Sequence, residues 1–146
     1  MKRIQIPNDI LFPEIRRMID EGLSVSLQVK GESMRPLIAG DRDSVTLSPV
    51  SRPLKKFDIV LARIAHGQYV LHRITKIGDN GITLMGDGNP KITEHCKSED
   101  VIAIAESINR KGKTIRTDSR YMRIYAVIWN FAKPLRRYLL GIHRRL

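Results

Sequence analysis

The stretch SVSLQVKGESMRPLIAGD, residues 24–41, joins a strand pattern to a turn that carries a serine. Its first part alternates Val25, Leu27 and Val29 with polar residues, which is the two-residue period of a half-buried strand. The glycines and the proline that follow are typical of a turn. Ser33 is therefore expected just beyond a strand end, where a small hydroxyl side chain can be a turn residue or a nucleophile.

The 146 residues have the length of one domain, and a hydrophobic content of 42% is enough to build a core. The only cysteine is Cys96, so the chain cannot form an internal disulfide framework. The neighbouring pair His95-Cys96 lacks the paired ligand spacing of a structural zinc site. We therefore expect neither a metal nor a cofactor.

Positive charge is concentrated in the last part of the chain. Residues 1–106 hold 15 Lys and Arg against 14 Asp and Glu, whereas residues 107–146 hold 11 against 1. Such a segment favours an anionic partner, either a membrane surface or a nucleic acid, although a solvated basic tail has the same composition. Nucleic acid is the weaker expectation because no aromatic-rich strand for base stacking accompanies the charges.

The local patterns predict a mainly β domain with a short N-terminal helix. Apolar residues at helical spacing predict a helix over about residues 9–21 that ends at Gly22. After the strand that precedes Ser33, short β-like runs are separated by Gly, Pro, Asn and Asp, and such close spacing indicates antiparallel strands. These runs cover residues 43–50, 58–65, 68–77, 81–87 and 101–108.

We expect residues 1–109 to form the domain and residues 110–146 to form a basic, partly helical tail. The apolar run from Ile124 to Trp129 is far shorter than the ~20 residues of a membrane-spanning helix. The tail is expected either to lie in a membrane interface, where Trp129 would enter lipid, or to pack Ile124, Val127 and Ile128 on the β-domain. The N-terminal residues predict neither a signal peptide nor a membrane span, so we expect a cytoplasmic protein or one peripheral at a membrane.

One histidine lies inside a strand pattern. His72, in the stretch GQYVLHRITKI at residues 67–77, would be held in place by a rigid backbone. A serine nucleophile needs a base to take its proton, and the base needs a partner that fixes its tautomer. An isolated histidine in a strand is more often structural, so the pattern leaves both roles for His72 open.

The ordered motifs resemble those of type I signal peptidases, in the branch found in archaea and the endoplasmic reticulum, within the superfamily that includes LexA-like repressors. The resemblance covers about residues 23–108 and implies the antiparallel β-fold of that superfamily. It depends on the motifs GESMRPLIAGD, DIVLAR, YVLHRIT, LMGDGNP and VIAIAESI, which begin at residues 31, 58, 69, 84 and 101.

The resemblance implies a serine endopeptidase. Ser33 would be the nucleophile, and its backbone N–H would hold the oxyanion. His72 would be the base, and Asp87 of the Gly-Asp-x-Asn box would orient it. The family also tends to place a second acidic residue shortly after that box, and only Glu94 could fill this role here, out of register. The acidic residue that would complete a catalytic triad with Ser33 and His72 is therefore Asp87 or Glu94.

The substrate is implied by the same resemblance. Signal peptidase-like enzymes bind an extended peptide as an added strand and cleave after small residues, as in signal peptide processing. Residues close in sequence to the catalytic ones are candidates for the substrate-binding walls, although each could equally be a core or turn residue. They are Val29, Met34, Pro36, Ile38 and Leu71.

The main alternative is a catalytically inactive or LexA-like regulatory module of the same fold. Two features weaken the LexA-like version. About 30 residues before Ser33 are too few for a helix-turn-helix domain, and the only Ala-Gly bond, Ala39-Gly40, lies inside the serine motif.

Overall fold

Eight strands form one antiparallel sheet within residues 8–28, 34, 37–38, 43–88 and 92–131, the part of the chain that this computed structural model describes. The prediction of a mainly β domain with an N-terminal helix and a C-terminal helix is confirmed. The elements are α1 (Asn8–Asp20), β1 (Val25–Gln28), β2 (Asp43–Ser48), β3 (Ile59–Arg63), η1 (Ala65–Gly67), β4 (Tyr69–Gly78), β5 (Gly81–Met85), β6 (Glu94–Cys96), η2 (Ser98–Asp100), β7 (Val101–Arg110), β8 (Lys113–Arg116) and α2 (Arg120–Phe131).

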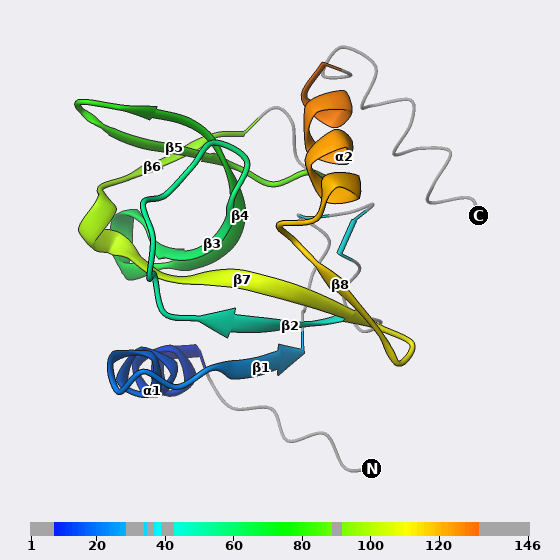
Figure 1. Cartoon of the computed structure of the whole chain (residues 1–146). Helices are drawn as coiled ribbons and strands as arrows, with labels where there is room; N and C mark the ends of the chain where they lie inside the picture. The colour runs from blue at the N-terminus through cyan, green and yellow to red at the C-terminus, as the bar shows by residue number, and fades with distance from the viewer. Residues whose placement is uncertain (1–7, 29–33, 35–36, 39–42, 89–91, 132–146) are drawn as a thin grey trace.

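Strand β7 connects the two parts of the sheet. The strand order is β1-β2-β7-β3-β4-β5-β6, and β8 pairs with the second half of β7. The sheet curls, so that β3 to β6 rise away from the β1-β2-β7 part (Figure 1). Helix α1 lies beside β1 and β7, and α2 stands near the other end of the fold (Figure 1).

The pattern of apolar residues in each strand matches the burial of its two faces. Strand β2 alternates buried and half-buried residues, as the two-residue period predicts. Strands β3 and β7 are buried on both faces along most of their length, which explains their continuous apolar runs. One hydrophobic cluster joins α1 to β2, β3 and β7, and a second is formed by residues of β3, β4, β5, β6 and β7.

The N-terminal helix ends as its sequence predicts. Gly22 has φ of +84°, a left-handed conformation that glycine adopts without steric cost. The Gly22 N–H donates to the carbonyl of Ile19 at 2.9 Å, and the Leu23 N–H donates to the carbonyl of Met18 at 3.0 Å. This pair of bonds is the Schellman motif, which satisfies the last carbonyls of a helix.

The expected boundary between residues 109 and 110 does not separate two packed units, because β7 runs through it to Arg110. Strand β8 then returns along β7, and α2 buries Met122, Ala126 and Trp129. Of the two alternatives for the tail, the one in which Ile124, Val127 and Ile128 pack on the domain is contradicted. These three side chains are exposed, on the opposite side of the helix.

No helix within the described ranges combines the length and the apolar character needed to span a bilayer.

Replacing Met122 by Ala tests whether α2 belongs to the folded unit. Met122 is 2% exposed and packs in the first hydrophobic cluster, so its removal should lower the free energy of unfolding by about 2–4 kcal/mol. The control Ile124→Ala, at a side chain that is 59% exposed, should leave that free energy nearly unchanged. Urea unfolding measures both, and equal effects would contradict the packing described here.

Candidate active site

Strand β4 carries two neighbouring buried polar residues, His72 and Arg73, on opposite faces of the sheet. Backbone pairing sets His72 opposite Val60 and Arg73 opposite Ile59. Val60 belongs to the second hydrophobic cluster and Ile59 to the first. The two side chains therefore need separate polar partners, because a buried polar group without a hydrogen bond is costly.

The partner of His72 is Glu94. Strand β6 sets Glu94 opposite Leu84, and β5 sets Leu84 opposite Ile74, which shares a face of β4 with His72. The His72 Nδ1 atom lies 2.6 Å from Glu94 Oε2. An ionised carboxylate only accepts hydrogen bonds, so a Glu94 carboxylate at this distance favours the tautomer with the proton on Nδ1. The pair is well shielded, with side-chain exposures of 7% and 19%.

This contact fixes the tautomer of the imidazole. With the proton on Nδ1, the lone pair of His72 is on Nε2, where it can accept a proton from a hydroxyl group. Within the described residues, the imidazole makes no side-chain hydrogen bond other than the one to Glu94. The carboxylate would also stabilise the imidazolium that forms when Nε2 takes up a proton. The His72–Glu94 pair is therefore equipped to act as a general base.

Asp87 does not orient His72. Both of its carboxylate oxygens accept hydrogen bonds from Arg73, from Nε to Oδ1 and from Nη2 to Oδ2, each at 2.8 Å. Asp87 is 1% exposed, and it lies in the turn that follows β5. The expectation that Asp87 is the acid beside His72 is thus corrected in favour of Glu94. The physical reason is that side chains alternate between the two faces of β4. The Arg73 guanidinium, and not the His72 imidazole, therefore faces Asp87.

Arg73 has two further contacts on its own face. Its Nη1 donates to the carbonyl of Phe57 at 3.1 Å, and its guanidinium lies 5.7 Å from the centre of the Tyr125 ring. Burial alone would lower the pKa of Arg73, but the charge and the hydrogen bonds of Asp87 raise that pKa above its ordinary value. The guanidinium therefore stays charged, in a planar bidentate pair with Asp87.

Phe57, whose carbonyl accepts the hydrogen bond from Arg73, has a strained backbone conformation. Phe57 has φ of +78°, which is unusual for a bulky side chain and costs of order 1–3 kcal/mol. Its N–H donates to the Ile74 carbonyl at 2.7 Å, and the Ile74 N–H donates to the Asp58 carbonyl at 2.7 Å. These bonds and the one from Arg73 hold the loop against β4, which offsets the strain.

The backbone of Asp87 is bound on both sides. The indole N–H of Trp129 donates to its carbonyl at 2.9 Å, so α2 is attached directly to this turn. The Asp87 N–H lies 3.4 Å from the sulfur of Met34. Ser33 lies outside the described residues. Its neighbour Met34 is buried beside this turn.

The predicted substrate-binding residues divide into three groups. Val29 and Pro36 lie outside the described residues. Met34 and Ile38 are buried in the first hydrophobic cluster, 2% and 0% exposed, so they are core residues and not walls of an open pocket. Leu71 is partly buried against the same cluster and retains some exposed surface.

A cavity of about 560 Å³ lies away from these residues. It is formed by the β4–β5 turn, the loop after β2 and η2, and it includes neither His72, Arg73, Asp87 nor Glu94. Among the described residues, no group of three or more His, Cys, Asp or Glu side chains is placed to hold a metal ion.

The sequence leaves Glu94 as an alternative to Asp87 for the partner of His72, because it does not predict the strand that carries Glu94. Strand β6 has three residues, with the sequence EHC, which are too few to show a period. The available signal was the family tendency to place a second acidic residue after the Gly-Asp-x-Asn box.

No protein-family model and no curated protein matches the chain.

Replacing Asp87 by Asn tests the buried pair. The neutral amide would leave the Arg73 charge buried and uncompensated, so we expect a loss of about 3–5 kcal/mol in the free energy of unfolding. The control Asp118→Asn removes an exposed pair with Arg116, whose side chains are 57% and 58% exposed, and should change stability little. Urea unfolding at pH 7 measures both variants. A small and equal effect would show that the Arg73–Asp87 pair does not support the fold.

Proposed function

We propose that this protein is a serine endopeptidase in which Ser33 is the nucleophile, His72 the general base and Glu94 the residue that orients His72. The observation that carries the proposal is the shielded contact of 2.6 Å between His72 Nδ1 and Glu94 Oε2. A second observation is the position of Met34, the residue after Ser33, beside Asp87, which precedes Glu94 by seven positions along the chain.

The reaction would proceed through an acyl-enzyme. Ser33 Oγ attacks the scissile carbonyl while His72 Nε2 accepts the hydroxyl proton, and the Ser33 N–H stabilises the oxyanion. The carbon–nitrogen bond then breaks, and the imidazolium gives its proton to the leaving amine. Water attacks the ester next, with His72 as base again, and returns Ser33 to its free form. Glu94 keeps the proton on Nδ1 and stabilises the imidazolium in both halves.

The substrate would be an extended peptide with small residues before the scissile bond, as the resemblance to signal peptidases implies. Strand β1 supports this mode of binding. It pairs with β2 on one side, and its other edge has no strand partner among the described residues. A peptide can add to such an edge through main-chain hydrogen bonds. Strand β1 ends at Gln28, five positions before Ser33 along the chain.

Arg73 and Asp87 are positioning residues in this mechanism. They would hold the turn after β5 and α2 in place on one face of β4, while His72 works on the other face. We also propose that the protein acts in the cytoplasm or peripherally at a membrane.

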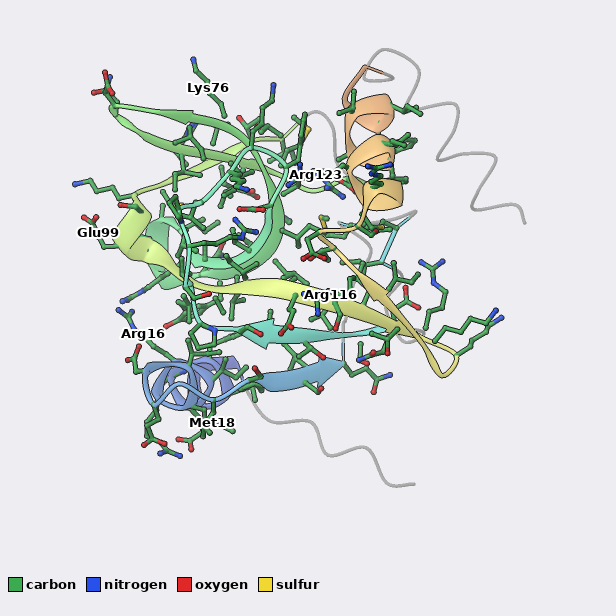
Figure 2. The ribbon with its side chains drawn as sticks, in the orientation of Figure 1. Arg16, Met18, Lys76, Glu99, Arg116 and Arg123 are labelled. Atoms are coloured by element: carbon green, nitrogen blue, oxygen red, sulfur yellow. The ribbon has the colours of Figure 1, made fainter. Side chains whose placement is uncertain are left out.

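Substitutions at the three residues test the mechanism with internally quenched peptides that carry Ala before the scissile bond. Ser33→Ala and His72→Ala should abolish hydrolysis. Glu94→Gln should lower kcat roughly a thousandfold by losing control of the His72 tautomer, with a smaller effect on KM. The matched control is Glu99→Gln, an exposed residue on η2 (Figure 2), and it should retain full activity.

Two outcomes would contradict the proposal. Full hydrolysis by Ser33→Ala or His72→Ala would remove that residue from the mechanism. If the folded wild-type chain cleaves no member of the peptide set but binds one, the regulatory or binding module of the same fold becomes the better assignment.

A further inference from the structure

Helix α2 has two apolar faces, and only one of them is covered by the domain. The inner face buries Met122, Ala126 and Trp129. The outer face presents Ile124 and Ile128, about 60% exposed, and Val127, 41% exposed. These three residues follow at i, i+3 and i+4, so their side chains form one strip along the helix.

The strip differs from the other exposed apolar side chains of the described residues. Leu23, Val50, Ile77 and Ile92 are also exposed, but each lies on a different segment. Single apolar residues on a surface are common, whereas a contiguous group marks an interaction site.

Cations flank the strip, and α2 carries no acidic residue. Arg120 and Arg123 are exposed on α2 itself. Residues 119–146 hold 7 Lys and Arg and neither Asp nor Glu. The nearest acidic residue before the helix, Asp118, is paired with Arg116. An uncovered apolar strip flanked by arginines is complementary to a lipid interface, which offers hydrocarbon beneath anionic headgroups.

We infer that the outer face of α2, formed by Ile124, Val127 and Ile128 with Arg120 and Arg123, docks on an anionic lipid bilayer. This inference rests on the peripheral position proposed above and is independent of the peptidase chemistry. The apolar side chains would enter the boundary between headgroups and acyl chains, and the arginines would bind phosphate and carboxylate groups.

Nucleic acid and a second copy of the chain fit this face less well. The described aromatic side chains of α2 belong to the inner contacts, since Tyr125 lies beside Arg73 and Trp129 is bonded to Asp87. Two copies that met through this face would bring like charges together. Three aliphatic side chains also cover far less than the ~800 Å² per partner of a stable interface.

The position of Trp129 in the structure changes the fluorescence response that we expect from it on vesicle binding. The sequence predicts that it enters lipid, but its side chain is 7% exposed and its indole N–H is already bonded inside the domain. Docking through the outer face should therefore leave Trp129 emission unchanged. A blue shift on vesicle binding would mean that α2 leaves the domain, which would contradict docking through this face.

The test is co-sedimentation of the full chain with vesicles of phosphatidylcholine and phosphatidylserine, 7:3, against vesicles of phosphatidylcholine alone. We expect binding to the anionic vesicles that weakens as salt rises, with a salt-resistant remainder from the apolar side chains. The test variant is Arg123→Gln/Ile124→Ser, and the matched control is Lys76→Gln/Ile77→Ser.

The control changes the same chemistry on β4, away from α2 (Figure 2). Ile77 is 45% exposed, so both double variants should fold. Loss of one cation near the surface corresponds to about fivefold weaker partitioning. With the loss of Ile124, we expect the α2 variant to partition roughly tenfold more weakly and the control to bind like wild type.

A fluorophore on the strip gives an independent reading. A thiol-reactive, environment-sensitive dye on the Ile124→Cys variant should shift to the blue on vesicle binding, and the same dye on Ile77→Cys should not. The native Cys96 gives little background, because it is 8% exposed and burial raises its pKa to about 11.

Besides a blue shift of Trp129, three results would overturn the inference. They are equal binding losses in the α2 variant and the β4 control, a dye that shifts at position 77 but not at 124, and a wild-type chain that ignores anionic vesicles while binding duplex DNA at the same salt. None of them changes the hydrolysis of soluble peptides, so failure of the membrane surface and failure of the peptidase proposal are distinguishable.

Discussion

The buried pair between Arg73 and Asp87 is the interaction on which the site depends. It joins β4 to the turn after β5, and each of the two residues also contacts further segments. Arg73 also binds the strained Phe57 loop, and the backbone of Asp87 binds Trp129 of α2 and the sulfur of Met34. A buried charge pair contributes little net stability by itself, but breaking it is costly, so it specifies one arrangement of these segments.

Side chains alternate between the two faces of β4, so the supporting residue Arg73 and the proposed base His72 lie on opposite faces. Arg73 faces the segments that must be held in place, and His72 faces Glu94 on the other face of the sheet. The two acidic residues thus have different functions that follow from their positions. Asp87 meets a guanidinium fork that occupies both of its oxygens, and Glu94 meets one ring nitrogen. Only the second arrangement leaves an imidazole ready to accept a proton.

The sequence predicts most of the sheet, because half-buried strands carry a two-residue period and Gly22 marks the end of α1. It misses β6 and β8, which have three and four residues and include charged side chains. Helical periodicity shows that residues 120–131 have apolar positions, but it cannot choose which face packs inward, so the position of Ile124, Val127 and Ile128 is left open between the domain and a membrane interface. The partner of His72 depends on the pairing of β5 with β6, a non-local fact that spacing alone does not give.

The most direct test of the account is the rate at which a fluorophosphonate phosphonylates Ser33, because this reaction needs an activated serine but no knowledge of the substrate. Intact-mass and peptide mass spectrometry measure it. The account predicts one adduct, on Ser33, that forms in the wild-type chain and slows roughly a thousandfold in His72→Ala, whose fold is checked by circular dichroism. An adduct that forms equally fast without His72, or a folded wild-type chain that forms no adduct on Ser33, would contradict it.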